Sequence, residues 1–156
     1  MIGLDPTHLR HLIVYPILNG LDLWNPAAEA LVLGTAIHES RLVYLRQSGG
    51  GPALGLYQIE PATHADLFRN FLDLRPELKA RVVQFRAPMP PPDEQLATNL
   101  AYATAVCRLL YYRAPEPLPA SGDVDGLAAY WKRHFNTPAG KGSPAAWAQH
   151  YREALT

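Results

Sequence analysis

Glu39 is the residue best placed to do chemistry, because it is a carboxylic acid that ends an otherwise apolar helical segment. The negative end of a helix dipole and partial burial both disfavour its ionised form, and so both raise its pKa. A general acid working near neutral pH needs such a shift. We therefore predict that Glu39 is catalytic, with a pKa above the ordinary value of about 4.3. The alternative is a polar helix end paired with Arg41 or Arg46.

The segment after the glycine-rich loop at 47–52 supplies groups that suit a sugar ligand. It reads GLYQI from Gly55 to Ile59. Glycine permits close approach of the backbone, an amide hydrogen-bonds to hydroxyl groups, and an aromatic ring stacks on a sugar face. We expect Gln58 to orient the substrate or a water molecule and Tyr57 to line a sugar subsite. Ser40 either assists by hydrogen bonding or only ends the helix.

The elements that must position these residues are predicted to be helices. Asn25 and Pro26 are typical of a helix start, and the apolar segment that follows has the pattern of a buried central helix ending at residues 38–40. Residues 54–59 form a short strand or an extended segment. The other helices are expected at 6–20, 61–70, within 72–85, in one long segment capped by Asp93, at 123–135 and after Ser143. This pattern predicts a mainly α single domain over residues 1–156, with at most a small β-hairpin near the active-site loop.

Composition excludes several other classes of protein. The 14 Lys and Arg residues balance the 14 Asp and Glu residues, and no basic block is present, which argues against nucleic acid as a partner. No stretch approaches the roughly 18–20 apolar residues of a membrane span, so we expect no membrane insertion. The N-terminal stretch is broken by charged residues and lacks the pattern of a signal peptide. We expect a product made in the cytoplasm.

Metals, cofactors and disulfides are not expected either. Cys107 is the single cysteine and lies in an apolar helical pattern, which predicts a buried structural thiol. His8 and His11 stand three residues apart on a predicted helix, but no further ligand completes a metal site. His64 and His134 are expected at the surface or at helix caps rather than in catalysis.

Three motifs give the chain a family resemblance. AIHES at residues 36–40, followed by PALGLYQIEPAT at 52–63, resembles the Glu-Ser and Gly-Leu-Met-Gln-Ile motifs of the lytic transglycosylases, which belong to the lysozyme superfamily. LAAY at 127–130 resembles the family's Ala-Ala-Tyr-Asn motif, although Trp131 stands where that motif has Asn. The segment WKRHFNTPAGKGS at 131–143 is similar to segments of phage-encoded proteins with lysozyme-like domains.

The resemblance implies a lysozyme-like fold and cleavage of the β-1,4 bond between N-acetylmuramic acid and N-acetylglucosamine in peptidoglycan. Glu39 would protonate the glycosidic oxygen and then act as base on the muramyl C6 hydroxyl, giving a 1,6-anhydro product without a second protein carboxylate. Tyr130 would contact the substrate near the acid. The implied partners are peptidoglycan glycan strands and other virion proteins, with the protein carried in a phage particle or released to act on the cell wall.

Two alternatives stay open from sequence. The first is a muramidase that hydrolyses the same bond with water, for which Glu60, Asp66 and Asp73 are candidate second carboxylates. Glu60 precedes Pro61 and is favoured as a solvated residue. The second alternative is a non-catalytic virion structural or assembly protein that retains the lysozyme-like fold, which the altered motif at Tyr130 and Trp131 keeps in consideration.

Overall fold

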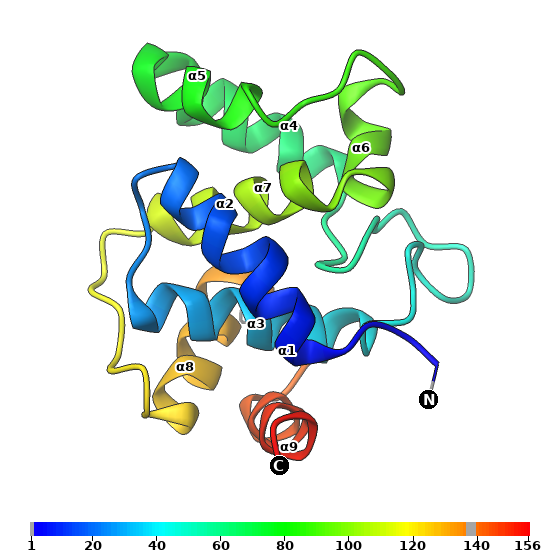
Figure 1. Cartoon of the computed structure of the whole chain (residues 1–156), viewed down its shortest axis with the longest axis vertical. Helices are drawn as coiled ribbons and strands as arrows, with labels where there is room; N and C mark the ends of the chain where they lie inside the picture. Colours follow the sequence, from blue (N-terminus) through cyan, green and yellow to red (C-terminus); the bar gives the residue numbers. More distant parts are fainter. Residues whose placement is uncertain (1, 137–139) are drawn as a thin grey trace.

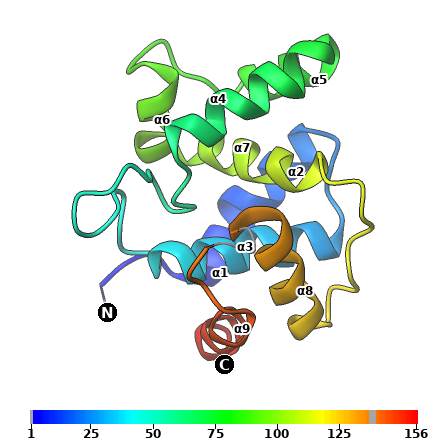
Figure 2. The ribbon, with the colours of Figure 1, turned by 180° about the vertical axis from the view of Figure 1, so that it is seen from behind.

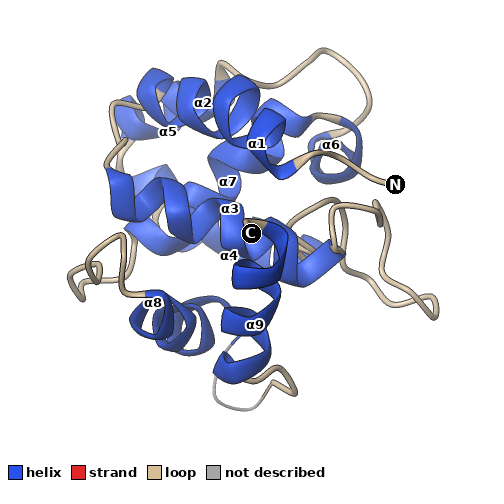
Figure 3. Cartoon of the chain, turned by 60° about the horizontal axis from the view of Figure 1, so that its bottom comes forward, coloured by secondary structure: helices blue, strands red, loops and turns tan. Residues whose placement is uncertain are grey.

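The computed structural model describes residues 2–136 and 140–156, and the mainly α prediction is confirmed there (Figures 1 and 3). The β-type pairing in these residues consists of two isolated antiparallel bridges, Arg46 with Leu54 and Leu54 with Ile59. They lie in the segment where the sequence allowed a short strand or extended chain. The buried apolar side chains of the described residues, apart from Ala53, form one continuous cluster.

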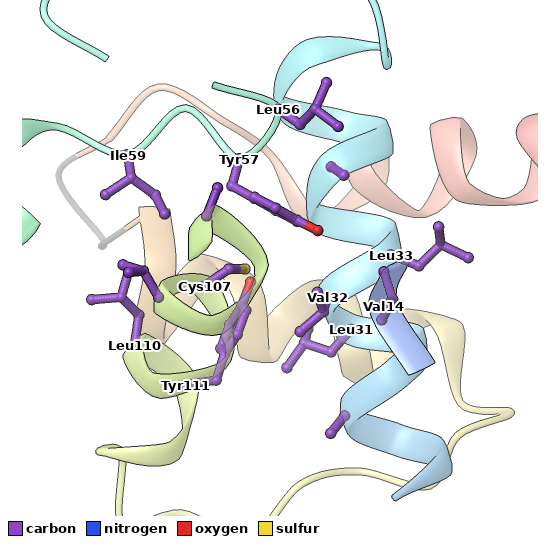
Figure 4. Packing of buried hydrophobic residues seen from close by; sticks show 14 of the residues in the cluster. Val14, Leu31, Val32, Leu33, Leu56, Tyr57, Ile59, Cys107, Leu110 and Tyr111 are labelled. Carbon is purple, nitrogen blue, oxygen red and sulfur yellow. The ribbon is translucent and has the colours of Figure 1, made fainter. Parts of the chain in front are cut away.

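The central element is α3 (Pro26–Ser40), which begins and ends where the sequence predicts. The Asn25 side chain accepts a hydrogen bond from the Ala28 backbone N–H at 2.8 Å, and Pro26 needs no partner at the first helical position. The helix ends because Arg41 adopts a left-handed conformation with φ of 54°. Figure 4 shows the side chains of Leu31 to Leu33 in the core.

The N-terminal helix contains a widened turn. It runs as α1 (Pro6–Leu9), a π-helical turn (Arg10–Val14) and α2 (Tyr15–Gly20). Asp5 starts α1 by accepting backbone hydrogen bonds from Thr7 and His8. The π-helical turn packs on both α3 and α7.

Four helices follow the bridged segment, and two of them replace the single long helix predicted after Asp93. They are α4 (Pro61–Asn70), α5 (Pro76–Val83), which follows a 3₁₀ turn (Leu72–Leu74), α6 (Pro92–Thr98) and α7 (Leu100–Tyr112). The long helix breaks at Asn99, whose extended backbone lets its side chain cap α7 at the Tyr102 N–H. Asp93 lies inside α6 and caps nothing, so that prediction is wrong.

The last two helices pack beneath α3. They are α8 (Val124–Trp131), which continues into a π-helical turn (Lys132–Asn136), and α9 (Pro144–Ala154). Asp123 and Ser143 cap them, as expected from the sequence. Residues 137–139, which belong to the predicted loop between them, lie outside the described residues. A Cβ atom on Gly34 of α3 would come within 2.2 Å of the Trp147 ring, so glycine is required for α9 to approach this closely.

These contacts divide the molecule into two groups of helices around α3 and α7. Helices α4, α5 and α6 pack against α7, and α8 and α9 pack against α3 and each other. Figures 1 and 2 show the two groups on opposite sides in both views. Glu39 lies at the C-terminal end of α3. No helix in the described part of the chain combines the length and apolarity that crossing a membrane requires.

Candidate active site

Glu39 lines a cleft of about 1030 Å³ at the end of α3. Four parts of the chain form its walls: the loop after α3, the start of α4, the end of α7, and the π-helical turn after α8 together with Gly140 and Lys141. The lining residues are Glu39, Arg41, Tyr44, Gln47, Ser48, Ala53, Gln58, Ile59, Glu60, Ala62, Thr63, Asp66, Leu110, Arg113, His134, Phe135, Asn136, Gly140 and Lys141. Carboxylate, amide, hydroxyl and cationic groups therefore face one space.

Burial raises the pKa of Glu39 to about 7, and a hydrogen bond from Trp131 opposes part of that rise. The direction agrees with the sequence-based expectation. The alternative that Glu39 only pairs with Arg41 or Arg46 is not supported, since neither forms an ion pair with it within the described residues. A half-buried carboxyl with this pKa is protonated in a large fraction of molecules near pH 7 and can both donate and accept a proton.

Trp131 is the neighbour of Glu39 that sequence reasoning missed. Its ring is fully buried, and its Nε1–H donates to Glu39 Oε1 at 3.1 Å. The edge-to-face contact of the His38 ring, with centroids 4.6 Å apart, holds the indole from one side. A signal was present, because Trp131 occupies a position at which the third motif departs from the pattern that it resembles, as do Lys132 and Arg133.

Gln58 lies in the same cleft as Glu39, as the sequence predicts. Its backbone is left-handed, with φ of 50°, and its Nε2 donates to the Gly55 carbonyl at 2.9 Å. Gly55 makes this tight turn possible. It has φ of +78°, and a Cβ atom there would lie 1.7 Å from the Leu96 carbonyl oxygen. The turn fixes the Gln58 amide at the cleft wall.

Tyr57 does not line the cleft, and the prediction that it forms a sugar subsite is wrong in this respect. Its side chain is fully buried, and its hydroxyl hydrogen-bonds to Thr104 Oγ1 at 2.7 Å. Figure 4 shows the ring between α3 and α7, near Cys107. The turn at Gly55 directs Tyr57 inward and Gln58 outward. Burial raises the pKa of Tyr57 well above its usual range.

Tyr130 and Ser40 are also held inside the protein. The Tyr130 hydroxyl donates to the Glu116 carbonyl at 2.8 Å and does not line the cleft, which removes it from the predicted substrate contacts. It ties α8 to the proline-rich loop before that helix. Ser40 Oγ donates to the Ala36 carbonyl at 3.0 Å and accepts from the Leu42 N–H at 3.2 Å. Of its two predicted roles, these bonds favour ending the helix.

The candidate second carboxylates separate into two groups. Glu60 and Asp66 line the cleft, whereas Asp73 does not, and its carboxylate lies 2.7 Å from Lys79 Nζ. Asp66 accepts a hydrogen bond from Arg113 at 2.7 Å, which contributes most to lowering the pKa of that carboxyl. Glu60 is exposed, as expected for a solvated residue.

Of the two histidines expected at the surface or at helix caps, His64 differs from that expectation. His64 is buried rather than on the surface, because the first turns of α4 and α6 meet there. One ring nitrogen hydrogen-bonds to Asp93 and the other to Tyr102, each at 2.6 Å. Burial lowers the pKa of His64, although Asp93 opposes the shift. His134 lines the cleft and contacts Glu116.

The segment after Trp131 is braced into the cleft wall. Lys132 Nζ donates to Asn136 Oδ1 at 2.8 Å and to the Gly140 carbonyl at 2.7 Å. A Cβ atom on Gly142 would lie 2.4 Å from the Trp131 ring, so the chain passes directly over the indole. Asn136 and Gly140, which these hydrogen bonds join to Lys132, both line the cleft.

The remaining residues singled out from the sequence are Cys107, His8 and His11. Cys107 is buried, and its burial raises the pKa of the thiol. His8 and His11 are exposed, and the described residues contain no cluster of three or more His, Cys, Asp or Glu side chains able to hold a metal ion.

Comparison of the chain with protein-family models, with curated proteins and with solved structures finds no match.

Proposed function

We propose that this protein cleaves the β-1,4 glycosidic bond between N-acetylmuramic acid and N-acetylglucosamine in peptidoglycan, with Glu39 as general acid and base. The observation that carries the proposal is the position of Glu39 in the cleft together with its raised pKa. Glu39 lies in a large cleft lined by several polar and charged side chains, burial raises its pKa to about 7, and it has no ion-pair partner in the described residues. A structural carboxylate at a helix end has no need of this environment, and an acid that transfers protons near neutral pH requires it.

The reaction needs one protein carboxyl when the nucleophile belongs to the substrate. Protonated Glu39 gives its proton to the glycosidic oxygen, and the C1–O bond of the muramyl residue breaks. The resulting Glu39 carboxylate then takes the proton of the muramyl C6 hydroxyl as O6 bonds to C1. The product is a 1,6-anhydro end, no water is consumed, and Glu39 returns to its protonated form. Gln58, at the cleft wall, supplies an amide that can orient the sugar.

Hydrolysis of the same bond is the second candidate, because Glu60 and Asp66 share the cleft with Glu39. In a retaining hydrolase the second carboxylate attacks C1, and in an inverting one it activates a water molecule. Asp66, ionised through its contact with Arg113, has the charge that either role requires.

Digestion of purified sacculi tests the proposal. Mass analysis of the products should find 1,6-anhydro ends, which are one water lighter than hydrolytic ends, and Glu39→Gln should fold normally and release no products. Asp66→Asn and Glu60→Gln should still give anhydro products, whereas loss of product with either would favour the hydrolase. Equal activity of wild type and Glu39→Gln would overturn the role of Glu39. A folded wild type that releases nothing would favour the non-catalytic virion role.

A further inference from the structure

The two oxygens of the Glu39 carboxyl are in different environments. Oε1 accepts the hydrogen bond from Trp131 Nε1 at 3.1 Å. Oε2 has no hydrogen-bond partner among the described residues, while the side chain lines the cleft. An indole N–H is a donor and never an acceptor. A proton on Oε1 facing Trp131 would place two donors against each other, so Oε1 must keep a lone pair toward the indole.

We propose that Trp131 is a positioning residue that holds Glu39 with Oε1 as the acceptor and thereby assigns the transferable proton to Oε2. This inference rests on the proposed general-acid function of Glu39. It adds a residue that the sequence motif does not supply, since the motif has an Asn at this position. An amide could face the carboxyl with either its donor or its acceptor end, and so would not distinguish the two oxygens. The indole does.

Trp131 can serve this role because it is itself immobilised on several sides. The His38 ring packs edge-to-face on it, and His38 Nδ1 is 2.9 Å from His150 Nδ1 on α9. Gly142 allows the backbone to pass within contact distance of the six-membered part of the indole. A donor whose own position is fixed by packing orients a catalytic group without cost at the moment of reaction.

The same hydrogen bond tunes the acid for both halves of the reaction. It stabilises the ionised carboxylate and opposes the effect of burial on the pKa of Glu39. Without it, burial alone would hold the proton more tightly, and Glu39 would be slower to give it up. The same N–H group of Trp131 therefore both orients the Glu39 carboxyl and limits the rise of its pKa.

Removing that N–H while keeping the ring tests the inference. Trp131→Phe removes the donor, and 3-benzothienylalanine at position 131 keeps the two-ring shape with sulfur in place of N–H. The pKa of Glu39 is read by ¹³C NMR of its carboxyl carbon, which needs no substrate or activity. It should rise by roughly one pH unit in both variants. On soluble peptidoglycan fragments kcat should fall by about 10- to 100-fold, and the alkaline limb of the kcat/KM profile should move to higher pH.

Trp147→Phe is the matched control. Trp147 is as deeply buried as Trp131, but its Nε1 has no hydrogen-bond partner in the described residues, and it packs against Gly34 rather than Glu39. This variant should lose stability and leave the pKa of Glu39 where it is. An unchanged pKa in the benzothienylalanine variant would overturn the inference, even if activity fell. The NMR result also stands apart from the proposed function, because a pKa rise in a protein that never cleaves peptidoglycan would support the hydrogen bond and refute only its catalytic use.

Discussion

Glu39→Gln should stabilise the protein at alkaline pH, because the wild type maintains a carboxyl in a site that disfavours its charge. Burial raises the pKa of Glu39 from 4.5 to about 7. Below pH 4.5 the carboxyl is protonated in both the folded and the unfolded chain, and it adds no pH dependence. Between these two values the unfolded chain releases the proton first, so folding becomes less favourable as the pH rises. Above pH 7 the penalty is complete.

The shift sets the size of the effect. One pKa unit corresponds to about 1.4 kcal/mol, so the penalty in the wild type reaches about 3 kcal/mol above pH 7. Glutamine has nearly the same shape, carries no charge and keeps an oxygen that accepts from Trp131. At pH 8 Glu39→Gln should therefore have a free energy of unfolding about 2–3 kcal/mol above that of the wild type. In a chain of this size, that raises the melting temperature by about 4–12 °C.

The assay is urea unfolding followed by circular dichroism at pH 4, 6 and 8, with Glu60→Gln as the control. Glu60 is exposed at the edge of the same cleft, and its replacement should change stability by less than about 0.5 kcal/mol at each pH. The gain in Glu39→Gln should be near zero at pH 4 and grow toward pH 8. Equal stabilities of wild type and Glu39→Gln at pH 8 would refute the argument that burial raises the pKa of this carboxyl.

Two further substitutions test the turn that places Gln58 at the cleft wall. Gly55→Ala should lower the free energy of unfolding by at least about 3 kcal/mol in urea titrations, because the left-handed φ of +78° disfavours a side chain and the Cβ would overlap the Leu96 carbonyl. A loss below 1 kcal/mol would contradict this geometry. Tyr57→Phe should cost about 1 kcal/mol for the lost bond to Thr104 and leave kcat/KM on peptidoglycan fragments unchanged. A raised KM with unchanged stability would instead return Tyr57 to the sugar-binding surface.

Local chemistry explains why so many helix boundaries could be predicted. Asn25 before Pro26 supplies a side-chain acceptor and a residue without a donor at the two positions where a helix start needs them. Ser143 before Pro144 does the same for α9. Glu39 could be predicted as an unusual carboxyl for a similar reason, since its helix end and the apolar residues before it are adjacent in sequence.

The wrong predictions concern contacts between segments distant in sequence. Tyr57 was expected in the cleft, but whether it points inward depends on Thr104 of α7, which lies 47 residues away. His64 was expected at the surface, but it is enclosed because α6 places Asp93 against α4. The break at Asn99 is likewise invisible in an apolar pattern that continues on both sides of it. Residue types identified the polar groups, and only packing decided which of them reach the cleft.

Trp131 is unusual already in the sequence, but its contact with Glu39 appears only in the folded protein. From sequence it was a departure from a motif, and it weakened the case for catalysis. In the folded protein it is the side chain that hydrogen-bonds to the acid, across 92 residues of sequence. The residue at this position must suit the surroundings of the carboxyl. A buried carboxyl is stabilised best by a rigid hydrogen-bond donor that cannot also act as an acceptor. Trp131, where the resembled motif has Asn, is therefore compatible with the proposed acid and does not count against it.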